Sequence, residues 1–166
     1  MVHEMRRWKQ RLEQTECEAI LRQATSGVLA LIDGEGTYAV PLSYVYQDHC
    51  LYFHCAKSGH KLELLQEHPS VSFCVIDQDH VVPDEYTTYF RSVIVFGEMD
   101  VLKDKQEKEL ALSALAHKYA PKHSMDQIHA YLSKHGEPCL ILRLRISHMS
   151  GKEAKELREK QVEQGS

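Results

Sequence analysis

Apolar and polar residues alternate most clearly near the end of the chain. Over residues 140–147 every second residue is Leu or Ile, and the residues between them include Arg143, Arg145 and Ser147. This period of two predicts a strand with one face in a core. Five shorter apolar runs bounded by turn residues also predict strands, over residues 28–32, 38–46, 51–55, 71–76 and 91–102. Six strands joined mostly by short turns favour an antiparallel barrel over a parallel α/β sheet.

Glycine and proline positions refine these strands. Residues 33–36 (DGEG) have the composition of a hairpin turn between the first two strands. Pro41 cannot donate to a sheet ladder, so it marks an edge strand or a bulge. Gly97 predicts a bulge through which the fifth strand extends. The polar residues 77–90 are expected to form a loop.

Helices are predicted between and after the strands. Thr15 stands three residues before Glu18, the spacing of a capping box, and starts a helix that ends by Gly27. A second helix covers residues 61–68.

Two further helices follow the fifth strand and are separated by Pro121. One starts at about Asp104, and the other starts with a capping box of Ser124 and Gln127. Residues 151–166 are dense in Lys and Glu, which predicts a solvated helix or a frayed tail.

Composition limits the class of protein. The chain has 166 residues, of which 43% are hydrophobic and 27% are charged, as in a soluble protein of one domain. No apolar run approaches the roughly 20 residues of a membrane helix, and the start of the chain is polar. Five cysteines without C-x-x-C spacing predict free thiols in a reducing compartment, the cytoplasm. A net charge of −4 argues against a nucleic-acid partner. The eleven histidines lack the spacing of a metal site, so no metal is expected.

Residues 56–61 (AKSGHK) combine the features of an anion-binding loop. A loop that leaves a strand and enters a helix directs free backbone N–H groups and the positive end of a helix dipole at one point. Ser58 can cap the helix, Gly59 permits close backbone approach, and the two lysines and His60 add donors. A phosphate group would match this set. An ordinary capped helix with solvated lysines would give the same pattern.

Several longer segments resemble the flavin-binding split-barrel family. They are SGVLAL (26–31), AVPLSYVY (39–46), LYFHCAKSGHKL (51–62), HPSVSF (68–73), YFRSVIVFG (89–97) and SGKE (150–153). The similarity covers residues 6–153 in the family's order. Within the family, the sequence is most similar to the nitroimidazole-resistance proteins, which are relatives of pyridoxamine 5'-phosphate oxidase.

The resemblance implies one mainly β domain over residues 1–166, with flanking helices and a six-stranded antiparallel split barrel. It implies a homodimer with FMN in grooves between the subunits. By the family pattern, the phosphate is held by Lys61, His60 and Ser58. The isoalloxazine ring is lined by Val40, Pro41, Leu42 and Ser43, with His54, Cys55 and Ala56 as the near wall. Ser92 stands where the oxidase has a glutamine that contacts the flavin.

The sequence also departs from the oxidase. His60 replaces an arginine, which puts the strength of phosphate binding in doubt. The oxidase ends in a segment with arginine and histidine that grips its vitamin B6 substrate, whereas this chain ends in a stretch rich in Lys and Glu. The resemblance therefore disfavours pyridoxamine 5'-phosphate oxidase activity itself.

Two functions remain open. In the first, FMN takes a hydride from a nicotinamide donor and reduces a small electron-poor acceptor such as a nitro-aromatic. His54 would be the proton donor or merely a wall residue, and His60 is the alternative functional histidine. In the second, the barrel is a non-catalytic module for a flavin, a deazaflavin or haem. Cys55 has no base beside it in sequence and is expected to be structural. Trp8 is predicted to dock across a dimer interface, onto the cofactor edge or as a cap on the core.

Overall fold

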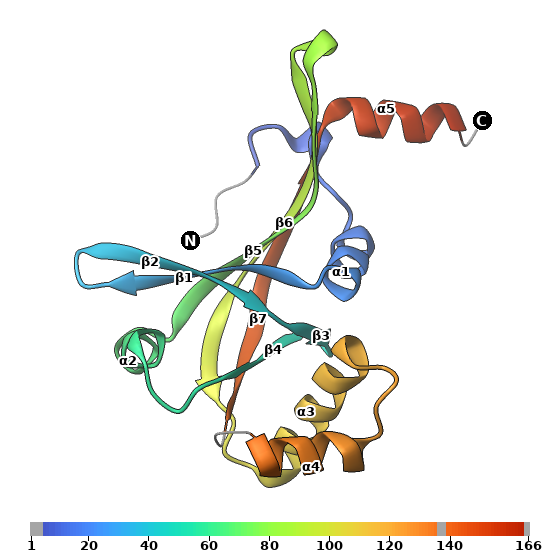
Figure 1. Cartoon of the computed structure of the whole chain (residues 1–166). Helices are drawn as coiled ribbons and strands as arrows, with labels where there is room; N and C mark the ends of the chain where they lie inside the picture. Colours follow the sequence, from blue (N-terminus) through green and yellow to red (C-terminus); the bar gives the residue numbers. More distant parts are fainter. Residues whose placement is uncertain (1–4, 136–138, 165–166) are drawn as a thin grey trace.

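One antiparallel sheet of seven strands organises the computed structural model, which describes residues 5–135 and 139–164 (Figure 1). The strands are β1 (Ser26–Asp33), β2 (Gly36–Ser43), β3 (Val45–Gln47), β4 (Cys50–Cys55), β5 (Ser70–Val82), β6 (Thr87–Val101) and β7 (Leu140–Glu153). Their order in the sheet is β2-β1-β5-β6-β7-β4-β3. The helices are α1 (Gln14–Gln23), α2 (His60–Glu67), α3 (Lys105–Tyr119), α4 (Met125–His135) and α5 (Lys155–Gln164), with short 3₁₀ turns η1 (Trp8–Gln10) and η2 (Pro83–Glu85).

The predicted count of six strands is wrong, because the expected strand over residues 38–46 is broken at Tyr44. The Tyr119 hydroxyl, at the end of α3, accepts from the Tyr44 N–H at 2.9 Å and lies 2.6 Å from the Tyr44 carbonyl oxygen. Both main-chain groups of Tyr44 are thus taken out of the ladder. The two pieces become β2 and β3, at opposite edges of a sheet that does not close on itself. Pro41 lies in the edge strand β2, as predicted.

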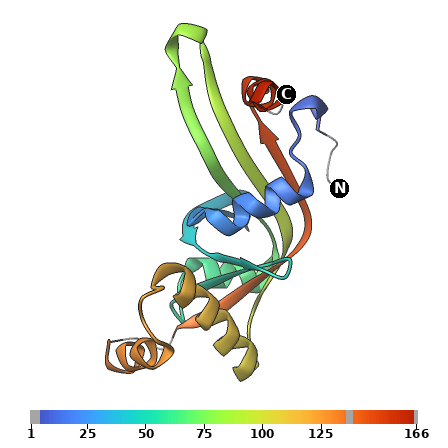
Figure 2. The same cartoon turned by 90° about the vertical axis from the view of Figure 1, so that its right-hand side faces the viewer.

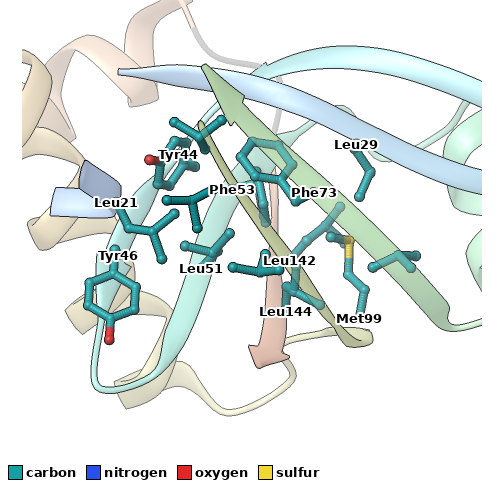
Figure 3. Close-up of a cluster of buried hydrophobic side chains, with 14 of the residues drawn as sticks. Leu21, Leu29, Tyr44, Tyr46, Leu51, Phe53, Phe73, Met99, Leu142 and Leu144 are labelled. Carbon is teal, nitrogen blue, oxygen red and sulfur yellow. The ribbon is translucent and has the colours of Figure 1, made fainter. Parts of the chain in front are cut away.

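The main core lies on one face of the strongly curved sheet, and residues of α1 and α2 pack into it. Figure 3 shows part of this core. Three aromatic rings meet in it: the Phe73 ring centroid lies 5.1 Å from that of Tyr44 and 5.2 Å from that of Phe53, both edge-on. Leu29, Leu51, Leu142 and Leu144 are fully buried beside them. Burying each such side chain contributes about 1.5–3 kcal/mol.

The expected loop over residues 77–90 is wrong, because β5 and β6 continue through it as a long hairpin. The ladder extends to the pair Val82↔Thr87, and Tyr86 closes the turn in the left-handed conformation. This arm projects from the body of the molecule (Figures 1 and 2). The predicted bulge at Gly97 is confirmed by a register shift between Phe96 and Gly97.

Helix starts follow the predicted capping logic with one correction. The first helix is capped by Glu13 rather than Thr15, and the Glu13 N–H donates to the Glu16 carboxylate at 2.6 Å. The capping box at Ser124 is confirmed, since the Ser124 N–H donates to Gln127 at 2.9 Å. Helix α3 begins directly after Asp104, close to the predicted start, and the Asp104 side chain caps it.

The end of the chain is less solvated than predicted. Gly151, Glu153 and Ala154 are buried, because β7 runs on to Glu153 and pairs with β6 along this stretch. Helix α5 follows from Lys155. Trp8 does not cap the core, since it is 69% exposed. Within the described ranges, no helix has the length and apolar character needed to cross a membrane.

Candidate functional site

The connection from β4 to α2 has the predicted strand, loop and helix. Gly59 is the residue at which α2 begins, with φ of 130°, a conformation that side-chain-bearing residues rarely adopt. Ser58 does not cap the helix, because no side chain does so. The first amides of α2, those of His60 and Lys61, have no partner within the helix. They present the positive end of the helix dipole at this point.

His60 ties the start of α2 to the β1–β2 hairpin. Its Nε2 lies 2.9 Å from Asp33 Oδ2, and its ring meets the Tyr38 ring edge-on with centroids 5.0 Å apart. The hydrogen bond to Asp33 raises the pKa of His60 above its usual value. A phosphate bound by His60 would therefore share the imidazole with the Asp33 carboxylate. The sequence alone did not reveal this pairing.

Lys61 is the better placed of the predicted phosphate ligands. It is half-buried, whereas Lys57 and Ser58 are exposed. Burial raises the pKa of the Cys55 thiol, and the positive charge of Lys61 partly opposes that rise. Lys61 has no ion pair with any described residue. Its charge is free to meet an anion at the start of α2.

Strand alternation divides the other predicted site residues between two faces of the sheet. In β2, Val40 and Leu42 pack against the core, whereas Pro41 and Ser43 are exposed on the opposite face. Cys55 in β4 is buried in the core, and its neighbour His54 points away from it. The side chains predicted to line the flavin ring therefore do not form one continuous wall within a subunit. Only the main chain of β2 runs past both the core-facing and the outward-facing set.

An open apolar face lies on the far side of the sheet from the core. Pro41 pairs with Val28, Val28 with Cys74, and Cys74 with Ile94, so the four residues form a stripe across β2, β1, β5 and β6. Val28 and Ile94 are each 38% exposed. Ser92 lies on the same face and pairs with the exposed Ile76. Ser92 is thus separated from β2 by β1 and β5 rather than placed beside α2.

His54 opens into a hollow of about 490 Å³ between β4, α3 and α4. Its other lining residues are Leu112, Ala116, Ala120, His123, Gln127, Ile128 and Cys139. The volume lies within the range of small-molecule pockets, and most of the lining is apolar. Sequence reasoning missed His123, which stands in the turn between α3 and α4, because no local motif connects it to His54.

A larger hollow of about 940 Å³ lies on the other side of the loop and suits a phosphate poorly. Lys57, Ser58 and Gly59 line it. Lys103 and Arg143 also line it, but Arg143 is already paired with Asp100 and Glu107. The lining includes four carboxylates, those of Glu63, Asp100, Asp104 and Glu107. Their negative charge opposes an anion. A phosphate is better accommodated at Lys61 and the amides that start α2.

The described residues contain no group of three or more His, Cys, Asp or Glu side chains arranged to hold a metal ion. The five cysteines are free.

The sequence model of the family described as "Pyridoxamine 5'-phosphate oxidase" matches residues 13–153. No curated protein matches the sequence. Several solved structures share the fold. A protein from Bacteroides thetaiotaomicron, described as a 5-nitroimidazole antibiotic resistance protein, is 22% identical over 86% of this chain and 85% of its own, with a TM-score of 0.69.

Two other solved structures extend the comparison. A FAD-binding protein from Mesorhizobium loti is 29% identical over 87% of this chain and 96% of its own, with a TM-score of 0.63. A FAD and haem binding protein from Mycobacterium smegmatis is 20% identical over 87% of this chain and 73% of its own, with a TM-score of 0.70.

Proposed function

Because the chain belongs to the pyridoxamine 5'-phosphate oxidase family, we propose that it binds FMN and reduces a small electron-poor acceptor, such as a nitro-aromatic, with a nicotinamide donor. Two likenesses support this proposal: that to the FAD-binding protein of M. loti and that to the B. thetaiotaomicron protein described as a nitroimidazole-resistance protein. We place it in the cytoplasm, where its free cysteines would stay reduced.

The main support for this proposal is the arrangement of main-chain amides and positive charge at the start of α2. Gly59 turns the chain so that the first amides of α2 are open, and Lys61 adds a positive charge that no described carboxylate neutralises. A terminal phosphate monoester, as in FMN, would meet both. Phosphate binding by residue 60 is weaker here than in the oxidase, because the His60 ring is already hydrogen-bonded to Asp33.

A second copy of the chain would complete the site. The stripe of Pro41, Val28, Cys74 and Ile94 leaves apolar surface that one subunit does not cover. We propose that a homodimer buries this face and brings Ser92 of one copy towards the flavin of the other. A molecular mass of one chain, measured by light scattering at micromolar protein with excess FMN, would rule out the dimer.

The bound flavin would supply two-electron redox chemistry. The chain would supply the acceptor pocket and a proton: the apolar hollow excludes water from a flat ring, and His54 at its wall can donate to the reduced acceptor. Replacing His54 with Ala should leave FMN bound and lower nitro-reducing turnover by about 10²- to 10⁴-fold. His80→Ala, on the projecting arm, is the matched control. Unchanged turnover in His54→Ala would make His54 a wall residue.

A second candidate function is a binding module without turnover. Two imidazoles, those of His54 and His123, line the same apolar hollow, and one solved structure of this fold is a FAD and haem binding protein. Anaerobic spectra separate the two functions. A yellow protein that a nicotinamide donor bleaches supports the enzyme, whereas a Soret band, or a flavin that no donor reduces, supports the module.

The flavin site is tested by measuring the affinities of FMN and of riboflavin for wild type and for Lys61→Ala. Loss of a hydrogen bond to a charged group costs about 1.5–3 kcal/mol, or roughly a ten- to hundredfold rise in the FMN dissociation constant. Riboflavin lacks the phosphate and should bind wild type and variant almost equally. Lys57→Ala, in the same loop but exposed, is the control and should change FMN affinity far less. Equal weakening of both ligands would show damage to the ring site, and an unchanged FMN affinity would place the phosphate elsewhere.

A further inference from the structure

A third hollow lies between the first described residues and helix α5, which meet at one end of the molecule (Figures 1 and 2). It measures about 670 Å³ and is lined by Arg6, Arg7, Trp8, Lys9, Gln10, Lys155, Arg158 and Glu159. We propose that this hollow binds an adenine nucleotide, with the base against Trp8 and the phosphate among the cations. The proposal does not depend on the flavin reaction.

Positive charge is concentrated in this hollow although the chain as a whole carries −4. Arg6, Arg7 and Lys9 are exposed, and none forms an ion pair with a described residue. Arg158 is already engaged: its Nε lies 2.8 Å from Glu153 Oε1, and its Nη2 donates to the Arg11 carbonyl at 2.6 Å. Arg158 therefore shapes the wall, and the free cations can meet a phosphate.

Trp8 gives the hollow an aromatic surface. It is the only tryptophan of the chain and is left exposed beside these cations, with the Lys9 ammonium 5.7 Å from its ring centroid. Base stacking on an exposed aromatic ring next to basic side chains is a recurrent way to hold nucleotides. The arrangement accounts for a large apolar ring that the core does not use.

Gln10 indicates that the ligand is a nucleotide with a base and not an inorganic anion. The residue as a whole is only 8% exposed, and its side-chain Oε1 is buried without a hydrogen-bond partner. A buried acceptor that is left unpaired is costly, so it marks a place where a donor is missing. The exocyclic amine of adenine is such a donor. Gln10 lies in the wall of the hollow two residues from Trp8, so a rotation of its side chain would present this oxygen to the base.

The shape favours a nucleotide over a lipid surface. The cations surround a concave space with a polar amide in its wall, and Trp8 is the only aromatic residue among the lining residues. A membrane-binding face would present several apolar residues on a convex surface. The nucleotide could be free, or it could be the adenylate half of a dinucleotide, because both carry the same base and 5'-phosphate.

Isothermal titration calorimetry with AMP on the full-length, FMN-loaded protein tests the site. We expect saturable binding of one AMP per chain, weaker binding of adenosine, and at least about a fivefold loss of AMP affinity in Trp8→Ala. The double variant Arg6→Ala, Arg7→Ala should bind AMP and adenosine alike. Gln10→Leu, which keeps the volume, should weaken AMP severalfold without lowering the melting temperature. Lys122→Ala, an exposed cation on the α3–α4 turn, is the control.

Competition with NADH distinguishes a free nucleotide from the adenylate half of a dinucleotide. If NADH displaces AMP, the ligand is the adenylate half of a dinucleotide; if it does not, the ligand is a free nucleotide. The proposal is overturned if AMP shows no saturable binding at millimolar concentration, or if Trp8→Ala binds AMP as wild type does. It is also overturned if Trp8 fluorescence responds to vesicles with anionic lipids but not to AMP, which would identify a lipid surface instead.

Discussion

Replacing Glu153 with Gln should lower the free energy of unfolding by about 2–4 kcal/mol, because its buried carboxylate pairs with two guanidinium groups. Glu153 is 0% exposed. Its Oε2 accepts from Arg91 Nε at 3.1 Å and from Arg91 Nη2 at 3.0 Å, and its Oε1 lies 2.8 Å from Arg158 Nε. One residue at the end of β7 thus connects β6 to α5.

The expected loss of stability follows from the burial of Glu153 and of the two arginines with which it pairs. Removing one partner of a buried ion pair costs about 3–5 kcal/mol, because the other charge is left without compensation. The Arg91 and Arg158 side chains are 25% and 32% exposed, so each can recover part of its hydration once the carboxylate is gone. Gln keeps the volume and one oxygen acceptor, which removes the cavity cost. Both effects lower the expected loss to about 2–4 kcal/mol, which extends somewhat below that range.

Urea denaturation at one protein concentration and a saturating FMN level would measure this loss, because association and ligand binding both shift apparent stability. The matched control is Glu159→Gln, on the same end of the chain but exposed, which should change stability by less than about 0.5 kcal/mol. A loss in Glu153→Gln no larger than in the control would refute the reasoning, since the carboxylate would then contribute no more than a surface charge.

Three further changes test the fold around the site. Gly97→Ala should cost about 3 kcal/mol or more, because a Cβ would lie 1.9 Å from the Arg145 carbonyl oxygen, whereas Gly36→Ala meets nothing nearer than 3.4 Å and should be tolerated; denaturant midpoints compare them. Tyr119→Phe should cost about 1–3 kcal/mol by freeing the main chain of Tyr44, measured in the same way. The raised pKa of His60 means that its pairing with Asp33 stabilises the fold below about pH 6.5 and stops doing so as pH rises through the folded pKa. The melting temperature of Asp33→Asn should therefore fall below that of wild type near pH 6 and match it in alkaline solution; a constant difference would contradict this.

Local patterns predicted the parts of the fold that depend on neighbours in sequence. The alternation in β7, the helix that begins after Gly59 and the edge position of Pro41 are all confirmed. The arm of β5 and β6 was missed because both of its faces lie outside the core, so its residues show no apolar period. The break at Tyr44 was missed because its cause is a hydroxyl 75 residues away in sequence.

The site was predictable only in part. The start of α2 is a local feature, and its loop could be recognised from six consecutive residues. The division of β2 into core-facing Val40 and Leu42 and outward Pro41 and Ser43 follows from the period of two in a strand, so the sequence already contained it. The pairing of His60 with Asp33 could not be foreseen, because the two residues are 27 apart and meet only through the fold.

The edge strand β2 disfavours pairing with a further strand, which is consistent with the proposed ligand site beside it. An unprotected sheet edge tends to pair with a further strand. Pro41 has no N–H to offer, so a strand added outside β2 could accept no hydrogen bond from that residue. The start of α2 meets the core-facing side of this edge through Tyr38, and Pro41 with Ser43 opens its other side. A ligand with an anionic end and a flat ring can use both sides, which a bare phosphate or a bare ring cannot.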